Sequence, residues 1–133
     1  MNVLASFLPL AAIGISAPGA DQSEQLEKIA LAVSSVQTCE QLGYSVDRAA
    51  LLDWTRSAQQ DAIASGQSEA EARTALEEAV NARHAADYER FADAKRMQHS
   101  EELVARNNQL WRSRCRGLSH DPLTAAYFAA AED

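Results

Sequence analysis

The sequence predicts an all-α fold: a small helical bundle of roughly four to five helices with a long, kinked central helix and one disulfide. Alanine is abundant and β-branched residues are few, and only five glycines and three prolines occur in 133 residues. This composition favours helices. Apolar residues recur three and four positions apart in successive segments, which is the spacing of one helix face. Cys39 and Cys115, the two cysteines, lie far apart in the chain.

The first helix is expected to begin near Asp21 and to end before Gly43. Asp21 and Glu24 have the spacing of a capping pair, and glycine is the commonest residue just after a helix end. The buried face of this helix is predicted from five apolar residues on one side: Leu26, Ile29, Ala30, Val33 and Val36.

The second and third helices have local start signals. Asp47 is a typical N-cap residue for the second helix, which Gly66 would end. Ser68 and Glu71 have the capping-box spacing that starts the third helix. The buried face of the second helix is predicted from four residues: Leu51, Trp54, Ala58 and Ala62.

Residues 69–116 contain neither glycine nor proline. One helix over this range would be roughly 72 Å long, longer than a compact domain of this size is wide. Ser100, followed by Glu101 and Glu102, has the pattern of a new helix start. We therefore predict a kink or break near His99 and Ser100 rather than one continuous rod. The apolar face turns there, from Ala72, Leu76, Val80, Phe91, Ala94 and Met97 to Leu103, Val104, Leu110, Trp111 and Leu118.

The end of the chain has two further signals. Gly117 is expected to close the fourth helix. Asp121 as N-cap and Pro122 as first residue would then open a short last helix. That helix would carry Leu123, Tyr127 and Phe128.

The N-terminal segment has the pattern of an export signal. Residues 1–20 carry no charge, Val3 to Ile15 is an apolar run too short to span a bilayer, and small residues follow it. We predict a signal peptide over residues 1–20, cleaved after Gly19 or Ala20, and a single α-helical domain over residues 21–133. The mature protein would be periplasmic or secreted, without a membrane span. The alternative is an apolar N-terminal helix that packs onto the domain.

The two cysteines are expected to form a disulfide if the chain is exported. A reactive thiol is the alternative for Cys115, because Arg112, Arg114 and Arg116 would each favour a thiolate there. The sequence has no Cys-x-x-Cys pair and no histidine with the spacing of a catalytic base, which favours the disulfide. The three arginines are then attributed to the negative end of the helix dipole.

Catalytic and metal-binding patterns are missing from the sequence. It has no Gly-x-Ser-x-Gly and no glycine-rich phosphate loop. His84 with Asp87, and His99 with Glu102, could each share a helix face, but two ligands do not make a metal site. We predict neither an enzyme nor a cofactor. Arg83 and Asp87, four residues apart, are interpreted as an ion pair within the third helix.

The net charge of −7 is unevenly spread. Eleven of the acidic residues and only four basic residues lie within residues 21–80. Nucleic acid is therefore a poor partner, whereas a basic protein would suit the acidic half. Arginine and tryptophan are enriched in interfaces. The candidate interface residues are Tyr44, Asp47, Asp53 and Asp61 in the acidic half, and Arg106, Trp111 and Arg112 in the basic segment.

The segment "TCEQL", residues 38–42, is similar to part of the small periplasmic acid-stress chaperones, which are helical, exported and joined by one disulfide. The cysteines lie further apart here, and no other motif is shared, so the likeness is one of architecture. Two functions remain open: a non-catalytic protein-binding protein of the inhibitor, immunity or accessory type, and an acid- or stress-responsive periplasmic chaperone.

Overall fold

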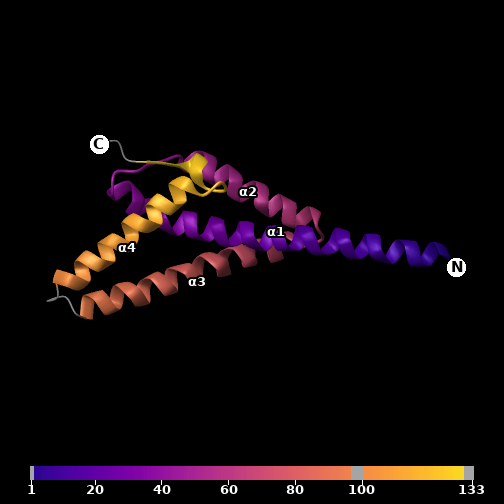
Figure 1. Cartoon of the computed structure of the whole chain (residues 1–133), viewed down its shortest axis with the longest axis horizontal. Helices are drawn as coiled ribbons and strands as arrows, with labels where there is room; N and C mark the ends of the chain where they lie inside the picture. The colour runs from indigo at the N-terminus through magenta and orange to yellow at the C-terminus, as the bar shows by residue number, and fades with distance from the viewer. Residues whose placement is uncertain (1, 97–100, 131–133) are drawn as a thin grey trace.

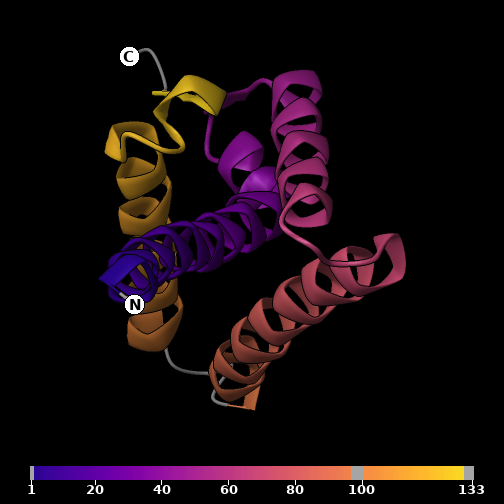
Figure 2. The same cartoon turned by 90° about the vertical axis from the view of Figure 1, so that its right-hand side faces the viewer.

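The structure is a computed structural model that describes residues 2–96 and 101–130, with side chains for residues 22–90 and 101–130. Its helices are α1 (Asn2–Gln41), α2 (Arg48–Ala64), α3 (Glu69–Arg96) and α4 (Glu101–His120). Figure 1 shows the long α1 running through the molecule, and Figure 2 shows the other three helices arranged around it. The predicted all-α bundle with one disulfide is confirmed.

Helix α1 is longer than the sequence predicted. In the uncleaved chain it runs without interruption from Asn2, rather than starting near Asp21 as expected for the mature chain. The capping pattern of Asp21 and Glu24 starts no helix because the preceding residues are already helical. Figure 1 shows the first half of α1 extending past the ends of α2 and α3. Cleavage after Gly19 or Ala20 would remove this extension and stays a prediction.

The other local signals behave as predicted. Gly43 follows the end of α1 with a φ of 97°, which a residue with a side chain rarely adopts. The Asp47 side chain accepts a hydrogen bond from the Ala50 N–H at 3.0 Å and caps α2. Ser68 and Glu71 form the capping box: the Ser68 N–H donates to Glu71 at 2.8 Å, and the Glu71 N–H donates to the Ser68 hydroxyl at 3.0 Å.

Helices α3 and α4 are separate, so the interpretation as one continuous rod is excluded. Helix α3 ends at Arg96 and α4 begins at Glu101. His99 and Ser100, where we predicted the break, lie outside the described residues, as do Met97 and the side chains of Phe91 and Ala94. Figure 1 shows that the chain reverses direction between the two helices, which brings both against α1.

The chain beyond α4 differs from the prediction in two ways. Helix α4 continues through Gly117 to His120, so Gly117 does not close it. The expected last α-helix is one turn of 3-10 helix, Ala125–Tyr127, followed by strand β2, Phe128–Ala129. Strand β2 pairs antiparallel with strand β1 (Ser45–Val46). Phe128 lies opposite Val46 in this pairing. The helix cannot continue further because the backbone of Phe128 is extended rather than helical.

The core lies where α1, α2, α4 and the last strand meet. Trp54 of α2 stacks on Tyr127 of the 3-10 turn, with ring centroids 5.1 Å apart. The buried cluster is Ala32, Cys39, Leu51, Cys115, Leu118 and Phe128. Three residues of the predicted buried faces are instead exposed: Val33, Val104 and Leu110.

Replacing Gly117 by alanine is expected to stabilise the protein by about 0.5–1 kcal/mol, because glycine inside a helix leaves the unfolded chain unusually free. No atom lies within 4 Å of the position that the new Cβ would take. Urea unfolding of Gly117→Ala measures the gain. Gly66→Ala is the matched control, and it should destabilise because Gly66 has a φ of 114°. A stability loss in Gly117→Ala would contradict the helical assignment.

Candidate binding surface

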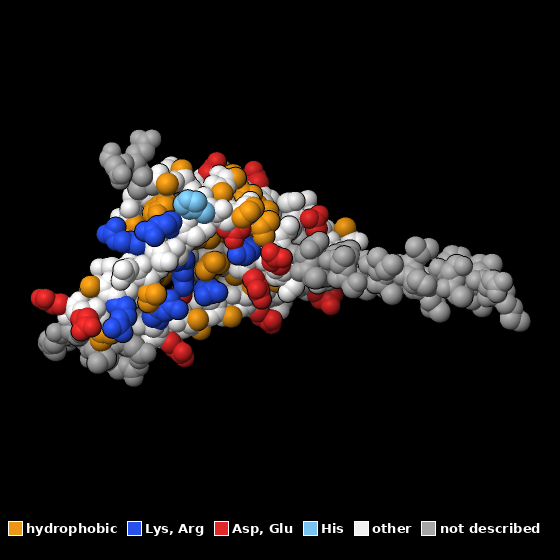
Figure 3. Space-filling view, in the orientation of Figure 1, with side chains coloured by type: hydrophobic (Ala, Val, Ile, Leu, Met, Phe, Trp, Pro, Cys, Tyr) orange, Lys and Arg blue, Asp and Glu red, His pale blue; other side chains and the backbone are white. Residues whose placement is uncertain are grey.

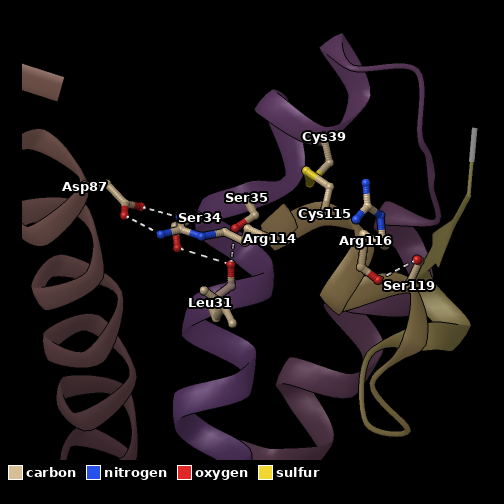
Figure 4. The surroundings of a disulfide bond; sticks show 9 residues. All are labelled: Leu31, Ser34, Ser35, Cys39, Asp87, Arg114, Cys115, Arg116 and Ser119. Carbon is tan, nitrogen blue, oxygen red and sulfur yellow. Dashed lines mark hydrogen bonds and ion pairs between the residues drawn. A yellow bond between two sulfur atoms is a disulfide. The ribbon is translucent and has the colours of Figure 1, made fainter. Parts of the chain in front are cut away.

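The disulfide fixes α4 to the end of α1. Cys39 and Cys115 are joined, with Cα atoms 5.7 Å apart, and both side chains are completely buried. Figure 4 shows the bond between the two helices, one turn beyond Ser35 on α1. The predicted pairing is confirmed, and Cys115 is therefore not a free thiol. The reactive-cysteine alternative is excluded for this state of the chain.

Arg114 joins α4 to α3, and this contact corrects two interpretations. Its guanidinium donates two hydrogen bonds to Asp87, at 2.9 and 3.0 Å, and it lies 4.4 Å from the centre of the Trp111 ring. The partner of Asp87 is thus Arg114 rather than Arg83. Figure 4 shows Arg114 reaching past Leu31 and Ser34 of α1, towards α3. The helix dipole is therefore not the reason for an arginine at this position.

A third contact holds the end of α4. The Lys28 Nζ of α1 lies 2.5 Å from Asp121 Oδ2, and Asp121 also accepts a hydrogen bond from the Leu123 N–H at 2.9 Å. The hydrogen bond from Lys28, followed by that from the Leu123 backbone, lowers the pKa of Asp121 below its ordinary value. Three contacts thus hold the second half of α4 in position: the disulfide, the Arg114–Asp87 pair and the Lys28–Asp121 pair.

The Lys28–Asp121 contact is expected to lose its stabilising effect in acid. A carboxyl group with a lowered folded-state pKa stabilises the fold fully above its unfolded pKa of about 3.9, and this stabilisation is lost as the pH falls from there through the folded-state pKa. Urea unfolding of Asp121→Asn should therefore show lower stability than the wild type at neutral pH and a difference that shrinks as the pH is lowered below about 4. A difference that stays constant across this range would contradict the assigned contact.

An apolar groove runs between α2 and α3, with α1 as its floor. We call it the α2–α3 groove. Its hollow has a volume of about 330 Å³. The exposed fraction is 49% for Leu52 and 37% for Val33, high values for large aliphatic residues. The groove is lined by Val33 and Val36 of α1, Arg48, Leu51, Leu52 and Thr55 of α2, and Leu76 and Val80 of α3.

A smaller hollow of about 240 Å³ continues the groove towards the connection between α2 and α3. The two hollows share Thr55 and Leu76. Glutamine side chains border the smaller one, and its walls include several alanines, which leave space for a larger side chain. The glutamines are Gln22, Gln25, Gln59 and Gln67, and the alanines are Ala58, Ala62, Ala72 and Ala75.

The polar groups of the α2–α3 groove already have partners within the chain. The Thr55 hydroxyl donates to the Leu51 carbonyl at 2.9 Å, and Arg48 donates to Glu40 through two nitrogens. The hydrogen bonds from Arg48 lower the pKa of Glu40. Throughout the described part of the chain, no buried side-chain nitrogen or oxygen lacks a partner. An occupant of the groove would therefore make apolar contacts with its floor.

The basic and acidic residues of α2 are unevenly placed around the helix. Arg48, Leu52 and Arg56 follow one another at four-residue spacing, on the side that borders the groove. Asp61 lies on the opposite side, seven residues after Trp54, which faces Tyr127. Asp53 is three residues before Arg56 and therefore borders the basic side. Of these two predicted interface residues, only Asp61 is thus clearly separate from the groove.

The candidate interface residues lie in two places that the fold does not bring together. Half-buried Tyr44 packs against the core, Asp47 caps α2, and Asp53 and Asp61 are exposed on α2. On α4, Arg106 and Arg112 are exposed, and Trp111 is half-buried beside Arg114. Figure 2 shows α2 and α4 on different sides of α1. The groove was missed because Val33 was predicted to be buried, and because Leu52 lies outside the apolar face predicted for the second helix.

Comparisons with known proteins found no significant match to this chain. No protein-family model matches the chain, and no curated protein or solved structure matches it significantly. In the described residues, no three histidine, cysteine, aspartate or glutamate side chains are grouped so as to hold a metal ion. Nor is any described helix both long enough and apolar enough to cross a membrane.

Proposed function

We propose that the chain is an exported, non-catalytic protein-binding protein of the inhibitor, immunity or accessory type, and that it binds an amphipathic helix of its partner in the α2–α3 groove. The observation that carries this proposal is the half-exposed apolar lining around Leu52 and Val33. Soluble proteins rarely leave contiguous apolar surface open to water unless something binds there.

The chemistry of the groove favours a helix over an extended peptide. An extended segment would bury backbone N–H and C=O groups against a surface whose own polar groups are already bonded. Each unpaired group would cost about 1–3 kcal/mol. A helix satisfies its backbone internally and presents only side chains to such a groove. Its apolar stripe would contact Leu52, Val33 and Val80.

The framework of the groove supports tight binding. Its floor is α1, whose C-terminal end the disulfide at Cys39 ties to α4. Its two walls, α2 and α3, begin at well-formed caps, Asp47 and Ser68. A surface that is ordered before binding loses less conformational entropy when the partner arrives, which raises affinity. The smaller hollow would take one large apolar side chain of the partner helix, in the manner of an interface hot spot.

Leu52→Glu should abolish partner capture, because it places a charge against the apolar stripe of the bound helix. The tagged mature chain is purified from the envelope or medium with its bound proteins, together with Leu52→Glu and the control Leu110→Glu. Leu110 is similarly exposed but lies on α4. We expect one protein bound to the wild type and to Leu110→Glu and lost from Leu52→Glu.

A photo-crosslinker at position 52 then identifies the contact. The crosslinked peptide of the partner should have apolar residues at helical spacing. A partner retained by Leu52→Glu, or a crosslink in an extended segment, would contradict the proposal.

Mass spectrometry of the same native protein tests export. We expect its first residue to be Ala20 or Asp21. An intact N-terminal segment would contradict it.

The chaperone alternative has one observation in its favour: two of the three contacts that position α4 depend on a carboxylate, Asp87 and Asp121. Protonation of Asp121 in acid would remove the Lys28–Asp121 contact while the disulfide keeps α4 attached. The apolar side of α4 around Leu118 could then open and bind unfolded clients. Binding of a hydrophobic dye that stays flat from neutral pH to about pH 3 would exclude this alternative.

A further inference from the structure

The outer face of α4 carries positive charge in a chain whose net charge is −7. From Leu103 to His120 the helix contains four arginines and no acidic residue. One of the four, Arg114, points inwards and pairs with Asp87. The others are exposed, and Figure 3 shows Lys and Arg side chains gathered over α4 on this face of the molecule. We call Arg112, Arg116 and His120 the α4 basic row.

The α4 basic row is a regular array. Its members are four residues apart, so they lie along one side of the helix with a rise of about 6 Å between neighbours. In the described part of the chain, neither Arg112 nor Arg116 has an acidic side chain within 4.0 Å, whereas Arg106 pairs with Glu102 at 3.6 Å. The charges of the two arginines are therefore open to a partner.

The helix dipole does not account for the whole row. A positive charge near a helix C-terminus is stabilising, but the effect falls off within the last turn. His120 lies in that turn, where its Nδ1 is 2.8 Å from the Arg116 carbonyl oxygen. Arg112 is eight residues earlier, two turns from the end. Two unpaired arginines at four-residue spacing repel each other slightly, which makes an external negative partner favourable.

We propose that the α4 basic row binds an acidic segment of a protein, through carboxylates about 6 Å apart. A helix with Glu or Asp at every fourth position presents this spacing. Each guanidinium can donate two parallel hydrogen bonds to one carboxylate, which gives geometric selectivity. This surface is distinct from the α2–α3 groove, because α4 lies on the other side of α1 from α2 (Figure 2).

The net charge of the chain favours an acidic protein segment over an anionic membrane as the partner of the α4 basic row. A membrane surface faces the whole molecule, and a chain of net charge −7 is repelled by it. Helix α4 also cannot turn its apolar side to lipid, since Cys115 and Leu118 on that side are buried and Cys115 is bonded to α1. A short acidic segment senses only charges within about 8 Å at physiological ionic strength. Within that range on α4 it meets arginines.

The test uses a fluorescent, alanine-based helical peptide with glutamate at every fourth position, and the same peptide with glutamine. The proteins are the full mature chain, Arg112→Gln/Arg116→Gln, and the matched control Arg56→Gln/Arg73→Gln, which removes the same charge from exposed arginines of α2 and α3. Fluorescence anisotropy at low salt measures binding. Thermal unfolding followed by circular dichroism should show that all three proteins are folded.

We expect the glutamate peptide to bind the wild type, with an affinity that falls as salt rises. The α4 double variant should lose about five- to ten-fold in affinity, and the control less than about two-fold. Equal losses in both variants, or equal binding of the glutamine peptide, would overturn the proposal. So would stronger binding to phosphatidylglycerol vesicles, which would make the ligand a lipid surface. None of these outcomes depends on Leu52, so the proposal for the α2–α3 groove and the proposal for the α4 basic row are tested separately.

Discussion

The Cys39→Ala/Cys115→Ala variant is expected to lose about 3–5 kcal/mol of its free energy of unfolding. The disulfide closes a loop over a sequence separation of 76 residues and restricts the unfolded chain strongly. Both sulfurs are also part of the buried core, so their removal leaves a cavity beside Leu118 and Phe128. A domain of this size has a total stability of about 5–15 kcal/mol, so the variant should be partly unfolded at elevated temperature.

Urea unfolding of the variant and of oxidised wild type measures this loss. The wild type unfolded and refolded in reductant is the control, because its thiols keep their volume while the covalent tie is gone. We expect reduction alone to account for most of the loss, with the alanine variant slightly less stable again. A reduced protein within about 1 kcal/mol of the oxidised one would show that packing alone fixes α4 against α1.

Much of the helix organisation could be predicted because its signals are local. Asp47, Gly43 and the pair Ser68–Glu71 act on backbone groups within a few residues, so their roles are visible in the sequence. The disulfide was predicted for a different reason, since an exported chain with two cysteines has only one internal pairing available.

The contacts between helices could not be predicted in the same way. Lys28 and Asp121 are 93 residues apart, and Asp87 and Arg114 are 27 apart. Periodicity shows which side of a helix is apolar, but it does not show which other helix meets that side. The four-residue spacing therefore led to the prediction that Arg83 pairs with Asp87. The pairing of β1 with β2 was also missed, because each strand has only two residues and therefore shows no repeating pattern.

The α2–α3 groove depends on how these two helices diverge, which the sequence does not encode locally. Val33 was predicted to be buried, since its spacing from Ile29 and Val36 is that of a core face. The structure leaves it 37% exposed because the space between α2 and α3 is not filled there. Gly117 is a related case. A glycine often marks a helix end, but here the Thr124 hydroxyl bonds to the Leu118 carbonyl, beyond the glycine.

Arg114→Leu is the second substitution with a large expected effect, about 2–4 kcal/mol of the free energy of unfolding. The Arg114 and Asp87 side chains are only 11% and 15% exposed, so the pair is largely removed from water. Leucine would leave the Asp87 carboxylate with neither of its two hydrogen bonds to the guanidinium. It would also remove the cation that lies over the Trp111 ring.

The double variant Arg114→Leu/Asp87→Leu separates the two contributions. If the unpaired carboxylate causes most of the loss, removing it should restore a large part of the stability, since an apolar pair can replace a buried ion pair at little cost. Arg112→Leu, two residues away on the exposed side, is the control and should change stability by less than about 0.5 kcal/mol. Urea unfolding of the wild type, Arg114→Leu, Asp87→Leu and the double variant gives the coupling between positions 87 and 114 as a double-mutant cycle. A coupling near zero, with Arg114→Leu and Arg112→Leu equally stable, would show that the contact between α3 and α4 does not position α4.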